Sequence, residues 1–451
     1  VRGSEPGCLF LRSPSKLDPN NLRYRTSLTT MDLEVLKSEV AAGHIDTVIV
    51  AFTDHYGRSL GKRFDAEFFI KEGADAGTHS CNYLLTVDME MEPVKGYEYA
   101  SWEKGYGDFH VVPDLATLRM AAWTDRTAIV LCDLVHDGQP VTVAPRSILR
   151  RQVARASDMG LVAKAASELE FYLYDDSYRD AFDKNYANLA PAGWYIDDYH
   201  VLQGARVEPY VRAARIALRD SEVPVENSKG EWGRGQHELN IRYAAVDTMA
   251  DRHVIMKQAM KEIADSMGIS VTFMAKPHSD SAGSSCHIHM SLWDSETNAP
   301  VFVGLDDQPS QKFYWFLGGW MKHVNDFMVM YAPTINSYKR YEDGSWAPTR
   351  IAWSDDNRTA GFRVVGHGKS LRIECRIPGA DANPYLALAA LLAGLHHGLT
   401  NTVEPCERST GNACMDPDPG LPLKWDTALD CLENGTILKE YLGEDYCKTY
   451  V

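Results

Sequence analysis

The sequence has no apolar run long enough to cross a membrane and no excess of basic residues. Its formal net charge is −16 over 451 residues, which argues against general binding to nucleic acid. The nine cysteines are irregularly spaced and form no CxxC pair. This pattern argues against a disulfide framework or a zinc site, and it favours a reducing, cytoplasmic location.

Two common phosphate-binding motifs are also missing. The sequence contains neither GxxxxGK[ST] nor GxGxxG. A nucleotide, if one binds, would therefore need a site other than a P-loop or a Rossmann fold.

The length of the chain predicts two domains. Residues 1–30 lack an apolar signal segment and are expected to be tag, linker or disordered residues, with the native chain starting near Met31. Residues 31–140 show short strand patterns and few helical ones, which predicts a small strand-rich domain ending at Gly138-Gln139-Pro140. Residues 141–451 alternate helices with strands and predict a larger α/β domain, so the whole chain is expected to be α+β.

Helical periodicity predicts five main helices in the larger domain, and Gly160 and Gly268 stand where C-terminal caps belong. The predicted helices cover roughly 146–159, 207–220, 248–267, 311–331 and 384–398.

Four strand patterns in the larger domain carry polar or charged residues on one face and apolar residues on the other. Successive side chains of a strand point to opposite faces, so alternate residues share one. Burying these groups unpaired would be costly, and a hard divalent cation would offset the cost. Carboxylates suit Mg²⁺ or Mn²⁺, and a histidine ligand favours Mn²⁺ slightly. The residues concerned are Glu168 and Glu170, Glu231 and Glu238, His287, His289 and Ser291, and Arg372, Glu374 and Arg376.

A solvated edge strand is the simpler explanation for any one of these patterns taken alone. Four such strands in one domain favour a metal site instead.

Six arginines fall within 37 residues of this acidic chain. Guanidinium groups suit phosphate and carboxylate oxygens, and arginines beside metal ions are typical of phosphoryl transfer. Ordinary ion pairs with Asp355, Asp356 and Glu342 are the alternative, and they would explain Arg350 first. The six are Arg340, Arg350, Arg358, Arg363, Arg372 and Arg376.

At these residues the chain resembles the glutamine synthetase family, across nearly all of residues 31–451. The motifs that carry the resemblance follow in the order of the family. They are Pro113-Asp114-Leu115, Ser167-Glu168-Leu169-Glu170-Phe171, Glu231 through Glu238, Thr272-Phe273-Met274-Ala275-Lys276-Pro277, Gly283 through Leu292, Asn336-Ser337-Tyr338-Lys339-Arg340, Asn357-Arg358, Arg372-Ile373-Glu374-Cys375-Arg376 and Asn383-Pro384-Tyr385-Leu386.

The resemblance implies an N-terminal β-grasp domain over 31–140 and a catalytic domain over 141–451. It also implies a double-ringed homododecamer with active sites between neighbouring subunits. Such an enzyme spends ATP to activate glutamate as γ-glutamyl phosphate, which an amine then attacks. Two divalent metal ions per site, Mg²⁺ or Mn²⁺, are expected.

Residue roles follow from the same resemblance, position by position. One metal would be held by Glu170, Glu231 and Glu238, and the other by Glu168, His287 and Glu374. The ATP phosphates would meet His289, Ser291, Arg358, Arg363 and Arg372, while Gly283, Arg340 and Arg376 would hold glutamate. Arg340, Arg358 and Trp346 are expected to take part in catalysis.

Three departures from the family pattern bear on the acceptor. Trp346 stands where ammonia-using members carry a flap glutamate, and an N-terminal Asp-Gly-Ser-Ser tetrapeptide is missing. Ala282 replaces an asparagine and Ser285 replaces a glycine. Ammonium must lose a proton before it attacks, so the loss of a carboxylate argues against it as the acceptor.

We therefore predict an organic, alkyl or aromatic amine as the acceptor, at a site formed by Trp346 with Trp194 and Tyr195. The reaction would be a first step of amine breakdown or detoxification. A polyamine remains open, because acidic residues are near in the sequence, and so does ammonia. An inactive structural or sensor relative is the alternative of a different class. The acidic residues are Glu90, Glu92, Asp197 and Asp198.

Overall fold

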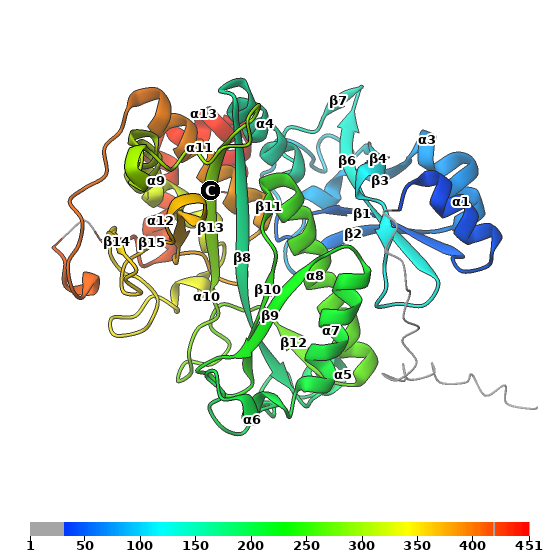
Figure 1. The fold of residues 1–451 in the computed structure, drawn as a ribbon. Helices are drawn as coiled ribbons and strands as arrows, with labels where there is room; N and C mark the ends of the chain where they lie inside the picture. The colour runs from blue at the N-terminus through cyan, green and yellow to red at the C-terminus, as the bar shows by residue number, and fades with distance from the viewer. Residues whose placement is uncertain (1–30, 418–419, 451) are drawn as a thin grey trace, which may run out of the picture.

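The computed structural model describes residues 31–417 and 420–450, so the prediction for residues 1–30 lies outside the described residues. Two mixed sheets, each covered by helices, make up the fold and confirm the expected α+β class. The first sheet, coloured blue to cyan in Figure 1, lies on one side of the long strand β8 (Leu161–Tyr174), which runs through the middle of the second sheet.

The first sheet has the strand order β2-β1-β6-β4-β3. Strands β1 and β6 are parallel, and the other pairs are antiparallel. Helix α1 (Leu33–Ala41) begins at Asp32, whose side chain accepts a hydrogen bond from the Val35 amide. The remaining elements are β1 (Thr47–Thr53), β2 (Ser59–Asp65), α2 (Ala66–Phe68), η1 (Phe69–Gly73), α3 (Ala74–Ala76), β3 (Thr78–Cys81), η2 (Asn82–Leu85), β4 (Asp108–Pro113), η3 (Leu115–Thr117), β5 (Arg119–Met120), β6 (Thr127–His136) and β7 (Gln139–Pro140).

The second sheet has the order β14-β15-β16-β13-β8-β10-β9, and every pair in it except β14 with β15 is antiparallel. On β8, Leu169, Phe171 and Leu173 are fully buried. This face packs on helices, so the opposite face is left to the polar side chains. The strands are β9 (Val225–Gly230), β10 (Gln236–Ile241), β11 (Ala244–Ala245), β12 (Ser270–Thr272), β13 (Cys286–Asp294), β14 (Trp353–Asp355), β15 (Phe362–Val365) and β16 (Arg372–Cys375).

The five predicted helices are confirmed within two or three residues at each end. They are α4 (Pro145–Asp158), α7 (Glu208–Asp220), α8 (Val246–Met267), α9 (Gln311–Tyr331) and α11 (Pro384–Asn401). Gly160, just past the end of α4, and Gly268, at the end of α8, have positive φ, as helix ends of this type require.

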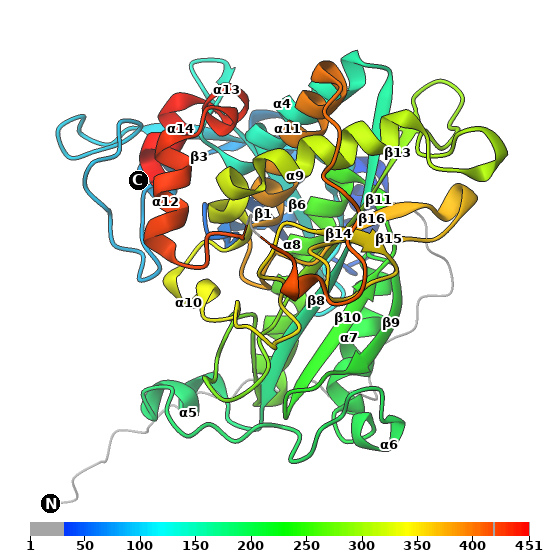
Figure 2. The same cartoon turned by 90° about the vertical axis from the view of Figure 1, so that its left-hand side faces the viewer.

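Helix α11 is buried along nearly its whole length between α4 and α9. Shorter helices complete the fold, and α5 and α6 lie at the foot of the molecule while α13 lies at the top (Figure 2). These shorter helices are α5 (Tyr178–Asp183), α6 (Val201–Gly204), α10 (Ile335–Tyr338), α12 (Trp425–Asn434), α13 (Ile437–Leu442) and α14 (Glu444–Tyr450), with single turns η4 (Leu305–Asp307), η5 (Gly368–Ser370) and η6 (Ala413–Met415).

A buried ion-pair network ties the first sheet to the helices of the second. The Arg146 guanidinium, on α4, donates to Asp114 (2.7 Å) and Asp133 (2.7 Å) of the first sheet region and to Asp251 (2.8 Å) on α8. The Tyr385 hydroxyl, on α11, donates to Asp251 as well, at 2.6 Å. The network therefore fixes how the two sheets sit together. Among the described residues, no helix is both long and apolar enough to span a bilayer.

Candidate active site

Strand register brings the predicted polar residues together on one face of the second sheet. Glu170 on β8 lies opposite Glu238 on β10, and Glu168 lies opposite His287 on β13. His289 in turn lies opposite Glu374 on β16. Directly opposed carboxylates destabilise a sheet, and a cation held between Glu170 and Glu238 would relieve this repulsion.

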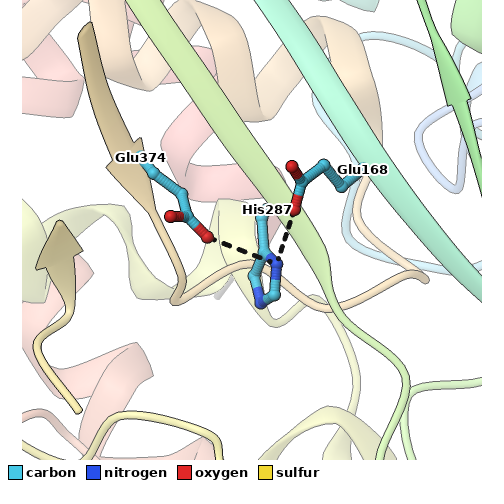
Figure 3. Close-up of side chains that lie close together, drawn as sticks. All are labelled: Glu168, His287 and Glu374. Atoms are coloured by element: carbon cyan, nitrogen blue, oxygen red, sulfur yellow. Dashed lines mark hydrogen bonds and ion pairs between the residues drawn. The ribbon is translucent and has the colours of Figure 1, made fainter. Parts of the chain in front are cut away.

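Glu168, His287 and Glu374 form one possible metal site (Figure 3). The Nδ1 atom of His287 lies 3.2 Å from an oxygen of Glu168 and 3.5 Å from an oxygen of Glu374. One ligand atom from each residue lies within 4.8 Å of the other two. These are the three residues that the resemblance assigns to one metal.

A second group lies beside the first. Glu170, Glu238 and His287 also bring ligand atoms within 4.8 Å of one another. Glu231, which the resemblance adds to this group, accepts a hydrogen bond from the Lys229 ammonium, and that ammonium also lies 3.7 Å from Glu238. The structure thus brings Glu170 and Glu238 together as expected, and it pairs Glu231 with a lysine.

Two side chains hold the Glu170 carboxylate in place. The hydroxyl of Ser285 donates to it at 2.5 Å, and the Ser285 amide donates at 2.8 Å. The Gln236 amide nitrogen lies 3.3 Å from the same carboxylate and donates also to the Gly283 carbonyl at 3.0 Å. Ser285, one of the departures from the family pattern, therefore orients a predicted metal ligand.

The electrostatics of the cluster fit a divalent cation. Burial, together with the neighbouring Glu231 and Glu238, raises the pKa of Glu170 to about 8, in spite of the hydrogen bonds from Ser285. Burial also raises the pKa of Glu231 and of Glu238, although Lys229 opposes it in both. A positive ion would relieve this repulsion, and a donor set of carboxylates with one imidazole suits Mg²⁺ or Mn²⁺.

Glu374 lies at the meeting point of two arginines. Arg376 donates to one of its oxygens at 2.6 Å and Arg363 to the other at 2.8 Å. Burial alone would raise the pKa of Glu374, but His287 and Arg376 outweigh it and lower the pKa to about 2. This carboxylate is therefore ionised at every physiological pH.

The other residues expected to meet phosphate lie along the same face. His289 Nε2 lies 2.9 Å from an oxygen of Glu168, and Arg372 donates to His289 Nδ1 at 3.2 Å. Ser291 accepts a hydrogen bond from Trp293 at 3.0 Å. Arg358 is exposed on the loop before β15. A line of basic groups therefore follows β13, β15 and β16 away from the carboxylates.

Arg340 is buried beside Gly283, the two residues expected at the glutamate carboxylate and amine. A Cβ atom at position 283 would lie 2.4 Å from Cγ of Arg340, so only glycine fits there. Arg340 also donates to the Ile377 carbonyl.

Ordinary ion pairing was the alternative explanation for Arg350. The structure shows no such pair for it among the described residues, and Arg350 donates instead to the carbonyls of Asp416 (3.3 Å) and Thr349 (3.2 Å). Among the described residues the predicted acidic partners pair elsewhere, Asp356 with Arg363 and Asp355 with Arg408. Backbone acceptors were closer than any carboxylate.

The three aromatic residues predicted at the amine site are all exposed. Trp346, in the loop after Arg340, is 65% exposed, and Trp194 and Tyr195 are 66% and 54% exposed. Trp194 and Tyr195 contact each other, with ring centroids 6.0 Å apart. Among the described residues, no ring contact joins Trp346 to either of them.

The loop that carries Trp194 and Tyr195 docks beside the carboxylates. The Asp198 amide donates to the Glu231 carbonyl at 3.0 Å, and the Lys229 ammonium lies 4.5 Å from the ring centroid of Tyr199. These contacts place the loop next to Glu231.

Comparison with known proteins shows which family the chain belongs to. The model of the glutamine synthetase catalytic domain matches residues 142–451. The chain belongs to the glutamine synthetase family. It is thus an ATP-dependent carbon–nitrogen ligase.

Several relatives within the family act on amines. The chain is 45% identical to a γ-glutamylethanolamide synthetase of Streptomyces coelicolor, over 93% of this chain and 90% of that protein. It is 37% identical to a glutamate–isopropylamine ligase of a Pseudomonas species, over 84% of each. Its fold matches a solved GmaS–ADP complex with a TM-score of 0.81, at 26% identity and over 94% of each chain.

Sequence reasoning predicted no role for Lys229 or Gln236, and it named Ser285 only as a departure from the family pattern. Lys229 and Ser285 contact predicted ligands, and Gln236 links Glu170 to Gly283. Gln236 stands in the Glu231–Glu238 motif, so that motif could have revealed it. Lys229, which contacts Glu231 and Glu238 in the structure, lies outside this motif and gave no comparable signal in the sequence.

Proposed function

We propose that this ligase joins the γ-carboxylate of glutamate to an organic amine through γ-glutamyl phosphate, as a first step in amine breakdown or detoxification. The observation that carries the proposal is the pair of carboxylate–histidine groups, Glu168–His287–Glu374 and Glu170–Glu238–His287, in a chain that has Trp346 at the sequence position of the flap glutamate. The names of the two relatives, a γ-glutamylethanolamide synthetase and a glutamate–isopropylamine ligase, support an organic amine as the acceptor.

Two divalent metal ions, Mg²⁺ or Mn²⁺, are proposed for the site. Glu168, His287 and Glu374 would hold one, and Glu170, Glu231 and Glu238 the other. The ions would neutralise phosphate charge during transfer. In this proposal, metal binding at Glu231 competes with its hydrogen bond from Lys229.

The chain's own residues would position the two other substrates. Arg363 and Arg372, with His289 and Ser291, form a basic line suited to the ATP phosphates, and Arg358 is proposed to complete it. Arg340 and Arg376 would bind the carboxylates of glutamate, with the backbone at Gly283 near its amine. In-line transfer of the phosphoryl group requires these side chains to be held in position. Most of them are buried or contact one another, which holds them there.

An amine attacks γ-glutamyl phosphate only when it is neutral. Trp346 provides an exposed apolar surface in place of a carboxylate that would attract a cation. This replacement favours a weakly basic or apolar amine over ammonium and over a polyamine with several charges.

The polyamine alternative depends on acidic residues around the site. Glu90 and Glu92 are exposed in the loop between η2 and β4. The Asp197 side chain is buried, with a carboxylate oxygen 3.4 Å from Nε2 of His237. Asp197 is therefore poorly placed to bind a distal ammonium group.

Replacing Trp346 with glutamate tests the acceptor. We expect the ratio of kcat/KM for ammonium to that for isopropylamine to rise about tenfold or more, because a carboxylate restores attraction for the cation. Isopropylamine, aniline, putrescine and ammonium would be compared on one preparation. Trp102→Glu is the matched control, because Trp102 is also exposed, at 70%.

Ammonium as the best acceptor of the unmodified protein would overturn the organic-amine proposal and leave an ammonia-using glutamine synthetase. Putrescine as the best would retain the organic amine but reject the apolar pocket. Release of no phosphate with any amine would favour an inactive sensor or structural relative.

We further propose that residues 31–140 are a β-grasp domain, that residues 141–451 are the catalytic domain, and that the protein is a homododecamer with sites between subunits. The sheet order β2-β1-β6-β4-β3 with its parallel β1–β6 pair supports the β-grasp assignment. The eight cysteines among the described residues are all free, which supports a cytoplasmic location.

Light scattering combined with activity measurement tests the assembly. We expect activity to elute only with particles far larger than the 50.4 kDa chain. Dilution should remove activity and large particles together, because each site would need two subunits. A fully active monomer would contradict the proposal.

A further inference from the structure

A cleft of about 310 Å³ lies between α4 and the C-terminal segment, and it shares no residue with the candidate active site. Helices α4 and α13 form its sides near the top of the molecule (Figure 2). This volume is at the lower end of the range for small-molecule sites. Its polar lining residues are Thr142, Arg151, Arg155, Glu440, Tyr441, Glu444, Asp445 and Tyr446.

Two arginines one helical turn apart face this cleft. Arg151 and Arg155 are half-buried, and among the described residues neither has a carboxylate within ion-pair distance. Like charges at this spacing repel each other. In a chain of net charge −16, two neighbouring arginines without carboxylate partners indicate a site for an anionic group.

Backbone contacts hold these arginines and leave donor groups available. Arg151 donates to the carbonyls of Thr142 (3.0 Å) and Leu442 (2.9 Å). Arg155 makes one long contact, 3.5 Å, to the Glu440 carbonyl and lies 4.4 Å over the Tyr441 ring. A guanidinium has five N–H donors, so both retain hydrogen-bonding capacity for a carboxylate.

The rim of the cleft has the opposite charge. The side chains of Glu440, Glu444 and Asp445 are exposed there. They would repel a ligand that is only anionic, and they would attract an ammonium group. The cleft therefore offers guanidinium groups at the half-buried side and carboxylates at the open side, which is complementary to a small zwitterion.

We propose that this cleft is a second binding site for a free α-amino acid, with its carboxylate on Arg151 and Arg155 and its ammonium group towards Glu444 and Asp445. The bound molecule would bridge α4 to the C-terminal segment. Helix α4 also carries Arg146 of the network that joins the two sheets.

Equilibrium dialysis with radiolabelled L-glutamate tests the site on the full assembled protein. We expect two glutamates per chain in the unmodified protein and one in Arg155→Gln, with the remaining site at Arg340. Loss of charged hydrogen bonds should weaken the cleft site roughly tenfold or more. Arg179→Gln, which changes an exposed arginine on α5, is the matched control and should still bind two.

Two further measurements separate the possible results. Arg340→Ala should bind one glutamate per chain, and adding Arg155→Gln to it should abolish binding. Glutarate, which lacks the ammonium group, should compete for the cleft site more weakly than L-alanine. One glutamate per chain in the unmodified protein, or unchanged stoichiometry in Arg155→Gln, would overturn the proposal. Competition by inorganic phosphate stronger than by L-alanine would overturn the amino-acid assignment.

Discussion

Glu374→Gln is expected to lower kcat/KM by about three orders of magnitude, equivalent to about 4 kcal/mol of transition-state stabilisation. The carboxylate of Glu374 contacts His287 and accepts hydrogen bonds from Arg363 and Arg376. Glutamine keeps the size of the side chain but removes its charge. One metal site would lose an anionic ligand, and two arginines would lose their partner.

The measurement combines steady-state kinetics with Mn²⁺ binding. We expect weaker Mn²⁺ binding in Glu374→Gln together with the loss of activity. Glu296→Gln is the matched control, because Glu296 is exposed at the far end of the same β13 hairpin. Full activity of Glu374→Gln, or unchanged Mn²⁺ binding, would reject the role of this residue as a ligand.

Arg340→Gln is expected to reduce kcat/KM for glutamate about 100-fold, since truncating one partner of a buried charge pair costs about 2–5 kcal/mol. Arg340 is buried beside Gly283, where a bound carboxylate would replace water. The effect should fall mainly on KM for glutamate, while KM for ATP changes little.

Arg350→Gln provides the comparison, because Arg350 lies at the end of the loop that follows Arg340 and donates only to threonine and backbone oxygens among the described residues. Its KM for glutamate should stay within a factor of two or three. Thermal unfolding of both variants distinguishes lost binding from lost structure. If KM for glutamate rises equally in both, the binding role belongs to the loop as a whole and not to Arg340.

The sequence predicted which residues share a face but not which strands are neighbours. Alternation along a strand is local, so the common face of Glu168 and Glu170 could be read directly from their spacing. The opposition of Glu170 and Glu238, or of Glu168 and His287, depends on register between distant segments. The family resemblance, and not the periodicity, supplied that grouping.

Side-chain partners were harder to predict than faces. Lys229 was not expected between Glu231 and Glu238, because its position depends on how β9 pairs with β10. Carboxylate partners were the alternative explanation for Arg350 because they are near in sequence, but the fold brings the Asp416 carbonyl closer. The relative position of Trp346 and Trp194 could not be predicted either, because both lie in loops.

The buried contacts of Arg146 have a consequence for interpreting inactive variants. This side chain joins Asp114 and Asp133 to Asp251, and within the described part of the chain it has no hydrogen bond or ion pair to a residue predicted to bind substrate. Removing one partner of a buried ion pair typically costs about 3–5 kcal/mol, which is a large part of the stability of most proteins. A substitution at Arg146 would therefore deplete the amount of folded protein in a cell, and an assay of crude extract would mistake low abundance for defective chemistry.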